Sequence, residues 1–351
     1  MKIVIGGYYG YKSLGDEAVL SVLTSSLKTR YPNCRITVLS ASPKKTAALY
    51  GCNSIHRYHI SSIVRCLSEA QLYISGGGSL MQDSTSARSL NYYCALIHLA
   101  KSLGTKVYAY ANGIGPLKNP QKAISAISKC DHISVRDEDS LRFLQDNNIE
   151  ATLSADPFVL CEAAEGHAVR RYLYDRGVRS ENYFTVSLRR CSGRRQINED
   201  ALLHVLLPYI IKGYTPVFVS MQDRCDLAIC AAMADMTGGH VITPTEPSML
   251  LGIQRDAQFA IGMRLHFLLA AACTHTPLLA LSYDPKVASV LKYVANVDVC
   301  DAFDFDSCLL ADGVPPKRQE KIDICSLRAL ATSDFDAVSA LIQAESDLVE
   351  A

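Results

Sequence analysis

Short apolar runs alternate with amphipathic segments along the first half of the chain. Six short runs end in glycine or polar residues and predict strands, at residues 2–5, 35–39, 71–74, 106–110, 133–135 and 151–153. Between them, apolar residues recur at the spacing of one helix face and predict helices, at residues 16–28, 61–68, 89–103, 121–128 and 140–146. Strands that alternate with helices indicate a mostly parallel, doubly wound α/β sheet.

The same alternation restarts after a polar, charged and weakly periodic stretch at residues 161–180. Strand patterns follow at residues 183–188, 216–220, 241–242 and 257–261, and helix patterns at residues 199–212, 225–236 and 248–253. We therefore expect two Rossmann-like domains, residues 1–160 and 161–351, because a chain of 351 residues is long enough for two separate cores. An amphipathic pattern at residues 334–348 predicts a terminal helix, which could cross back onto the first domain.

Composition argues against a disordered, a nucleic-acid-binding and a dinucleotide-binding protein. Hydrophobic residues make up 49% of the chain, which argues against disorder. The 35 basic and 35 acidic residues cancel, and no long basic block occurs, so we expect no nucleic-acid partner. Any anion must then be recognised by a local concentration of positive charge. The glycines at positions 6, 7 and 10 do not form the fingerprint of a dinucleotide-binding turn.

Cysteine usage and hydropathy indicate the compartment. The 13 cysteines include no CxxC pair, which predicts reduced thiols in a cytoplasmic protein, and with the 9 histidines they form no ligand-spaced cluster, so we expect no metal. Met1 leads straight into a strand, without the apolar stretch of a signal peptide. The apolar run from Leu265 to Tyr283 contains His266, His275 and Pro277, so a buried helix, a turn and a strand explain it better than a membrane span. We expect at most peripheral membrane contact.

A strand-to-helix turn at residues 262–266 carries the strongest candidate chemistry. It places Arg264 and His266 two positions apart at the carboxyl end of a predicted strand, where open α/β sheets bind ligands. A guanidinium group beside a glycine and a helix start suits an anionic ligand. The alternative is a structural ion pair for Arg264 and a hydrogen-bonded core role for His266, which is the commoner outcome for such a pair taken alone.

A similar strand precedes the triple glycine Gly76-Gly77-Gly78 in the first half. The glycine turn and the cationic turn could therefore face each other across an interdomain cleft. Three glycines let a ligand approach the backbone closely, but a tight turn that packs strand against helix is equally consistent with them. Gln82 and Asp83 follow as hydrogen-bonding groups suited to sugar hydroxyls. Gly15 and Asp16 could line the same cleft, although Asp16 serves equally well as a helix N-cap.

Six motifs in order along the chain resemble those of the polysaccharide pyruvyltransferases, most closely of the CsaB type. They are Gly15-Asp16-Glu17, Gly76-Gly77-Gly78-Ser79-Leu80-Met81-Gln82-Asp83, Gly113-Ile114-Gly115-Pro116, Ser134-Val135-Arg136-Asp137, Ser187-Leu188-Arg189 and Gly262-Met263-Arg264-Leu265-His266. The resemblance implies a two-domain, glycosyltransferase-B-like fold with its site in the interdomain cleft. It also implies transfer of pyruvate from phosphoenolpyruvate to a sugar of a cell-surface polysaccharide precursor, as a cyclic ketal and with release of phosphate.

The resemblance also suggests roles for individual residues. Arg189 and Arg264 would bind the phosphate and carboxylate of phosphoenolpyruvate, and Lys286 could add a third positive charge. His266 would act with Arg264 in catalysis as the proton-transfer group, because ketal formation needs protonation of the methylene carbon near neutral pH. The acceptor-binding residues would be Gly15, Asp16, Gly76, Gly77, Gly78, Gln82 and Asp83.

The CsaB type acts on a lipid-linked saccharide made at the cytoplasmic face of the membrane. We therefore expect this acceptor class and a cytoplasmic protein that works at the inner face of the cell membrane. No cofactor is expected, because phosphoenolpyruvate is a co-substrate. Two other classes stay open, a nucleotide-sugar-dependent glycosyltransferase on the same fold and a catalytically silent sugar-binding protein. The sequence determines neither the sugar nor the oligomeric state.

Overall fold

The chain folds into two compact units, each built on its own parallel sheet. The computed structural model describes residues 1–84, 86–190, 196–283, 287, 290, 291, 299–303, 314–316 and 323–349. The first unit comprises Met1–Leu160 together with the segment that begins at Cys325, and the second comprises Cys161–Ile324.

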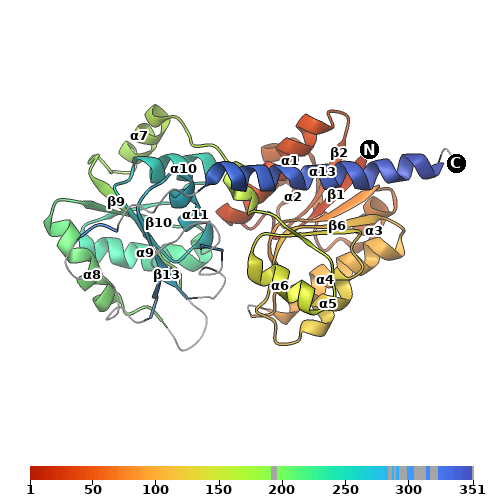
Figure 1. The fold of residues 1–351 in the computed structure, drawn as a ribbon. Coiled ribbons are helices and arrows are strands. Elements are labelled where there is room, and N and C mark those ends of the chain that lie inside the picture. Colours follow the sequence, from red (N-terminus) through yellow and green to blue (C-terminus); the bar gives the residue numbers. More distant parts are fainter. Residues whose placement is uncertain are drawn as a thin grey trace. The chain divides into compact units, whose positions relative to one another are not determined.

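The first unit contains an eight-stranded sheet in the order β3-β2-β1-β4-β6-β7-β8, with β5 also paired to β6. Its strands are β1 (Lys2–Gly6), β2 (Arg35–Ser40), β3 (Asn53–His56), β4 (Leu72–Ser75), β5 (Gly78–Met81), β6 (Lys106–Ile114), β7 (His132–Val135) and β8 (Thr152–Leu153). Its helices are α1 (Leu14–Arg30), α2 (Pro43–Tyr50), α3 (Ile60–Ser68), α4 (Ala87–Ser102), α5 (Pro120–Ile127), α6 (Glu138–Asp146), the short 3-10 helix η1 (Pro157–Leu160) and α13 (Ile324–Val349). Figure 1 shows α4 and α5 on one face of this sheet and α1 with α13 on the other.

The second unit contains a six-stranded parallel sheet in the order β11-β10-β9-β12-β13-β14. Its strands are β9 (Tyr183–Ser187), β10 (Thr215–Val219), β11 (His240–Ile242), β12 (Ala260–Gly262), β13 (Leu278–Ser282) and β14 (Val299–Asp301). Its helices are α7 (Gly166–Tyr174), α8 (Glu199–Ile211), α9 (Asp223–Thr237), α10 (Pro247–Asp256) and α11 (Leu265–Cys273). In Figure 1, α8 and α9 cover one face of the sheet, and α10 and α11 cover the other.

Burial on both faces explains why the strands are continuously apolar. Ile3, Val4 and Ile5 of β1 are at most 2% exposed, as expected for a parallel sheet with helices on both sides. The apolar run that begins at Leu265 forms α11, which is buried from Phe267 to Ala272, followed by a turn and β13. None of the described helices combines the length and hydropathy needed to cross a bilayer.

The terminal helix α13 packs with the first unit. Asp334 accepts a hydrogen bond from Ser154 at 2.7 Å, and the Arg328 Nε donates to the Val159 carbonyl at 2.8 Å. The helix begins at Ile324, ten residues before the predicted start, because its first turns also bury apolar side chains such as Leu327. The segment from Cys325 onward thus belongs to the first unit, which is the crossing back that the sequence pattern allowed for the terminal helix of the second domain.

Two local features differ from the sequence prediction. The triple glycine was expected to form a turn, yet its last residue begins β5, with Gly78 paired to Asn112 and Met81 paired to Ile114 of β6. Gly78 has a φ of +110°, which glycine adopts readily and which redirects the chain alongside β6. Asp16 was a candidate N-cap, but α1 begins at Leu14 with Ser13 in the cap position.

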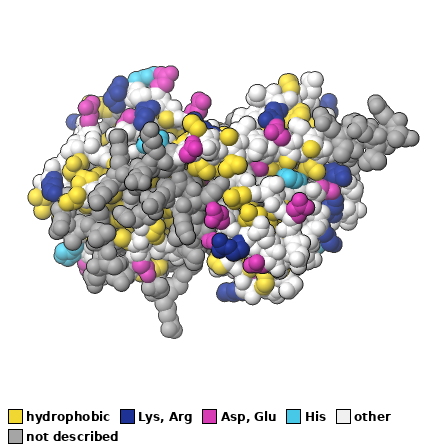
Figure 2. Space-filling view, in the orientation of Figure 1, with side chains coloured by type: hydrophobic (Ala, Val, Ile, Leu, Met, Phe, Trp, Pro, Cys, Tyr) yellow, Lys and Arg dark blue, Asp and Glu magenta, His cyan; other side chains and the backbone are white. Residues whose placement is uncertain are grey.

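Charge is mixed on the face of the molecule that Figure 2 shows. On the face that Figure 2 shows, Lys and Arg are interspersed with Asp and Glu among the described side chains. The described side chains on this face form no broad positive patch, and the formal net charge of the chain is zero. Anion recognition therefore depends on individual arginines at defined positions.

Candidate functional site

The two predicted donor arginines lie at the carboxyl edge of the second unit's sheet. Strands β9 and β12 are hydrogen-bonded neighbours, with Gly262 opposite Ser187, so the residues that follow them emerge side by side. The Met263 amide donates to the Ser187 carbonyl at 2.8 Å and continues this pairing by one step. A Cβ atom at Gly262 would lie 2.5 Å from the Phe267 ring, so glycine is required for α11 to pack against the turn. This packing sets the position of Arg264.

Asp226, which the sequence analysis did not single out, connects this site to a third strand. It lies in α9, is fully buried, and its carboxylate accepts the backbone amides of Met221 and Gln222 at 3.1 and 2.9 Å. Arg264 Nε lies 3.6 Å from the same carboxylate oxygen. The sequence could have indicated Asp226, because this carboxylate comes six residues after the predicted strand at residues 216–220, which ends at the same edge of the sheet.

The charges of both arginines affect the pKa of the Asp226 carboxyl group. Burial raises the pKa of Asp226, while the Arg264 and Arg189 guanidinium groups and the two backbone amides oppose that rise. Arg189 Nη1 donates to the Tyr283 hydroxyl at 3.3 Å, and its guanidinium carbon lies 5.7 Å from the centre of the Tyr283 ring. The structure therefore brings Arg189, Arg264 and Asp226 together at one edge.

Arg264 keeps hydrogen-bonding capacity after its contact with Asp226. Its Nη1 atom is buried and has no hydrogen-bond partner in the part of the chain that the structure describes. Arg264 also stands at the N-cap position of α11, where the backbone amides and the helix dipole favour an anion. A guanidinium donor held in this way suits a phosphate or carboxylate oxygen.

His266 lies in the first turn of α11, two residues after Arg264, and is half-buried. A helix start fixes its backbone relative to that of Arg264. Lys286, the third predicted donor residue, lies outside the described residues.

The predicted acceptor glycines have packing partners. A Cβ atom at Gly76 would lie 2.1 Å from the Tyr9 hydroxyl oxygen, and one at Gly77 would lie 3.0 Å from a Val19 methyl group. Protein atoms therefore occupy the space next to these glycines. Gly78 faces Asp16, whose Oδ1 would lie 3.4 Å from an added Cβ atom.

The polar acceptor candidates also have structural contacts. Asp83 accepts the backbone amides of Lys118 and Asn119 at 2.8 and 3.2 Å, and these bonds, the Lys118 bond foremost, lower its pKa. Gln82 accepts a hydrogen bond from Ser84 at 2.6 Å. Gly15 is buried in the first turn of α1, where the Asp16 carboxylate accepts the Ser13 hydroxyl at 2.5 Å. These residues share one edge of the first unit. The hydrogen bonds of Asp83 and Gln82 stabilise the local loops.

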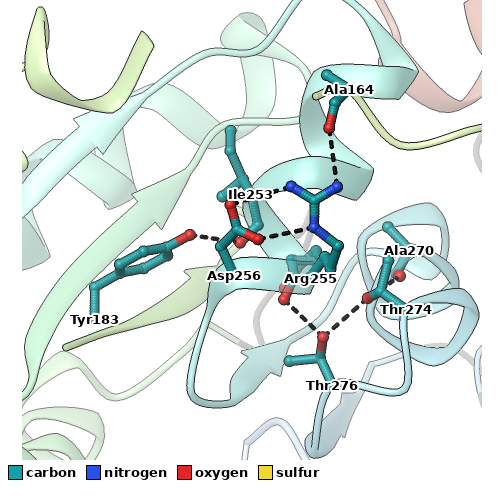
Figure 3. Close-up of polar contacts among 9 residues, drawn as sticks. Ala164, Tyr183, Ile253, Arg255, Asp256, Ala270, Thr274 and Thr276 are labelled. Atoms are coloured by element: carbon teal, nitrogen blue, oxygen red, sulfur yellow. Dashed lines mark hydrogen bonds and ion pairs between the residues drawn. The ribbon is translucent and has the colours of Figure 1, made fainter. Parts of the chain in front are cut away.

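A hollow of about 660 Å³ lies at the opposite, amino edge of the second sheet, beside Tyr183 and Asp256. Figure 3 shows how polar groups at this edge bond to one another. Arg255 pairs with Asp256 at 2.8 Å and donates to the Ala164 carbonyl at 3.0 Å, and the Tyr183 hydroxyl donates to the Ile253 carbonyl at 2.7 Å. Open α/β sheets bind their ligands at the carboxyl ends of strands, so we place the candidate site with Arg264 and not in this hollow.

Comparison with known proteins identifies the family. The family model for polysaccharide pyruvyl transferase matches residues 14–285, which include both arginines and all the motifs named above. The chain belongs to the polysaccharide pyruvyl transferase family. A search of curated protein sequences gave no significant match.

Solved structures similar to this family member share its fold at low sequence identity. UDP-GlcNAc 2-epimerase from Methanocaldococcus jannaschii is 11% identical, with a TM-score of 0.65 over 97% of this chain and 99% of that one. A glycosyltransferase from Rickettsia africae is 9% identical, with a TM-score of 0.53 over 99% of this chain and 97% of that one. These similarities establish a glycosyltransferase-B-like fold of two parallel-sheet α/β domains.

Proposed function

We propose that this pyruvyl transferase uses phosphoenolpyruvate as donor and forms a cyclic ketal on a sugar of a cell-surface polysaccharide precursor. The observation that carries the proposal is the position of Arg189 and Arg264 beside one buried carboxylate, with His266 on the adjacent helix turn. Phosphoenolpyruvate carries a phosphate and a carboxylate, and two guanidinium groups match two anionic groups. No cofactor is required.

The residues suit each part of this reaction. Protonation of the methylene carbon of phosphoenolpyruvate yields a methyl group and leaves the neighbouring carbon electron-deficient. Two sugar hydroxyls attack that carbon, their protons leave, and the carbon–oxygen bond to phosphate breaks. His266 is the group that transfers a proton, and Arg264 and Arg189 stabilise the departing phosphate charge. Asp226 holds Arg264 in position.

The acceptor in this proposal is a lipid-linked saccharide at the cytoplasmic face of the membrane. Its basis is the resemblance of the sequence motifs to the CsaB type. Incubation of the protein with phosphoenolpyruvate and a panel of lipid-linked or soluble N-acetylhexosamines, followed by mass analysis, tests it. The product should carry the added mass of a pyruvyl ketal, and phosphate should appear in equal amount.

Removal of either arginine tests the donor site. Arg264→Ala and Arg189→Ala should each weaken phosphoenolpyruvate binding by about 10- to 100-fold in calorimetry, since charge-assisted hydrogen bonds are lost. Arg171→Ala removes an exposed arginine from α7 and serves as the matched control. Unchanged donor affinity in both site variants would contradict the proposed donor pocket.

A nucleotide-sugar-dependent glycosyltransferase is the second candidate. The observation in its favour is the fold shared with a solved glycosyltransferase, although a fold by itself does not determine chemistry. Release of UDP from UDP-GlcNAc, without phosphate release from phosphoenolpyruvate, would support this alternative. Saccharide binding with release of neither UDP nor phosphate would indicate a catalytically silent binding protein.

A further inference from the structure

Arg57 lies among tyrosine rings at the carboxyl edge of the first unit's sheet. It directly follows β3, and its guanidinium carbon lies 4.4 Å from the ring centre of Tyr92. The ring centres of Tyr11, Tyr58 and Tyr93 lie 5.3, 5.3 and 5.5 Å from the same carbon. All four distances are in the range of cation–π contacts. We refer to these five residues as the Arg57 cluster.

The charge of Arg57 has no carboxylate partner among the described residues. The residue is only 3% exposed, and its two hydrogen bonds are long, 3.2 Å to the Gly7 carbonyl and 3.4 Å to the Tyr93 hydroxyl. Its Nε atom has no hydrogen-bond partner in the described chain. Burial of a cation without a counter-ion destabilises a fold unless the surrounding groups compensate. Around Arg57, the compensating groups are the four tyrosine rings at cation–π distance.

The rings of the Arg57 cluster are partly open to solvent. Tyr58 is 60% exposed, and Tyr11 and Tyr92 are half-buried. Tyr8 extends the surface, because its ring stacks on Tyr11 with centres 4.3 Å apart and an angle of 13°. The Tyr92 hydroxyl donates to the Arg57 carbonyl at 2.7 Å, which fixes this ring to the loop after β3.

This arrangement matches the surface of a pyranose ring. A pyranose presents a face of C–H groups that packs on an aromatic ring, and hydroxyls around its rim that hydrogen-bond with phenol groups. At the same edge, Tyr9 fills the space beside Gly76, and backbone amides occupy the Asp83 carboxylate. The Arg57 cluster is therefore the better candidate for sugar stacking.

We propose that Tyr11, Tyr58 and Tyr92 bind a pyranose ring of the saccharide acceptor, with Arg57 as the positioning residue that fixes their rings. The identification of this saccharide as the acceptor rests on the proposed function. The binding surface itself does not depend on phosphoenolpyruvate.

Saccharide binding without donor tests the proposal directly. The full-length protein is titrated with the methyl glycosides of N-acetylmannosamine, N-acetylglucosamine and galactose, and binding is followed by saturation-transfer NMR. At least one glycoside should bind the wild-type protein. Tyr58→Ala should weaken this binding about 3- to 10-fold, on the scale of one aromatic contact. Tyr58→Phe keeps the ring and should bind within about twofold of wild type.

Tyr174→Ala is the matched control, because Tyr174 is 61% exposed and lies in the second unit. It should leave glycoside binding unchanged. Arg57→Lys keeps the charge but loses the planar group that contacts the rings, so it should raise the acceptor KM and leave the phosphoenolpyruvate KM unchanged. A parallel rise in both constants would mean a structural role only.

Glycoside binding and phosphate release are measured separately, so failure of the sugar-binding proposal is distinguished from failure of the proposed function. If no glycoside binds, or if Tyr58→Ala binds as wild type while phosphate release continues, the tyrosine surface is not the acceptor site. If Tyr58→Ala weakens glycoside binding but no phosphate is released from phosphoenolpyruvate, the sugar-binding surface stands and the donor assignment falls.

Discussion

At the scale of single residues, the turn at 262–266 combines a cation and an imidazole on one rigid element. Arg264 is the N-cap residue of α11, and His266 follows in its first turn. A turn that orients a bound donor through Arg264 also fixes the distance from His266 to that donor. In the proposed function, donor binding and proton transfer belong to separate side chains, so each role can be tested separately.

Replacement of His266 by Asn should lower turnover by about 10²- to 10⁴-fold and leave phosphoenolpyruvate binding nearly intact. Asn retains hydrogen bonding but does not titrate near neutral pH. Turnover is measured as phosphate release and donor binding by calorimetry.

The matched control for this variant is His275→Asn. His275 is exposed in the turn after α11 with a φ of +56°, a conformation that Asn tolerates well. The control should keep full turnover. Near-normal turnover in His266→Asn would return His266 to the role of a core histidine.

At the scale of elements, Asp334 ties α13 to the first unit. Burial raises its pKa to about 6, against the opposing effect of hydrogen bonds from Ser154, Tyr108 and Ser134. A carboxyl group whose pKa is raised on folding destabilises the folded state at every pH at which the unfolded chain holds that group ionised. This cost is complete above pH 6 and disappears as the pH falls through 6 toward the ordinary value of 3.8.

Replacement of Asp334 by Asn should therefore stabilise the protein at neutral pH. A pKa of about 6 in place of 3.8 corresponds to up to about 3 kcal/mol in the free energy of unfolding. The rise in Tm should be largest at pH 7.5 and should shrink as the pH is lowered toward 4. Thermal unfolding followed by circular dichroism measures it.

Asp336→Asn is the control on the same helix, because the Asp336 side chain is 71% exposed and pairs with Arg30 on the surface. Its effect on Tm should be small, since exposed ion pairs contribute little. A lower Tm for Asp334→Asn at every pH would contradict this prediction and show that the carboxyl group, with its hydrogen bonds, stabilises the helix contact.

At the scale of the whole molecule, the two units carry different chemistry. The second unit holds the paired arginines with Asp226, and the first holds the Arg57 cluster and the predicted acceptor residues. Each set lies at the carboxyl edge of its own parallel sheet, which is the ligand edge of such folds. The placement of a shared site in an interdomain cleft stays a prediction.

We expect phosphate release to be independent of metal ions. The described part of the chain contains no group of three or more His, Cys, Asp and Glu side chains placed to hold a metal. Activity in the presence of EDTA should equal activity in its absence, because the arginines supply the positive charge. Loss of activity in EDTA and its recovery with a divalent ion would contradict this expectation.

The sequence by itself determined the alternation of strands and helices, the change of pattern near residue 160 and the motifs that identify the family. These features are local, because the periods of 2 and 3.6 residues and the turn glycines are visible within short windows. The short elements α2, β3 and α7 were missed, since their patterns are too brief or too polar to stand out.

Only the tertiary structure decided which distant residues meet. The adjacency of β9, β10 and β12 brings Asp226 to Arg264, and no pattern in the sequence specifies this order of strands. The same applies to Arg57 and its tyrosines, which come from three separate segments, and to Tyr9, whose ring fills the space beside Gly76. Local sequence sets the type of each element, whereas partners across a core depend on how the buried faces of all elements pack together.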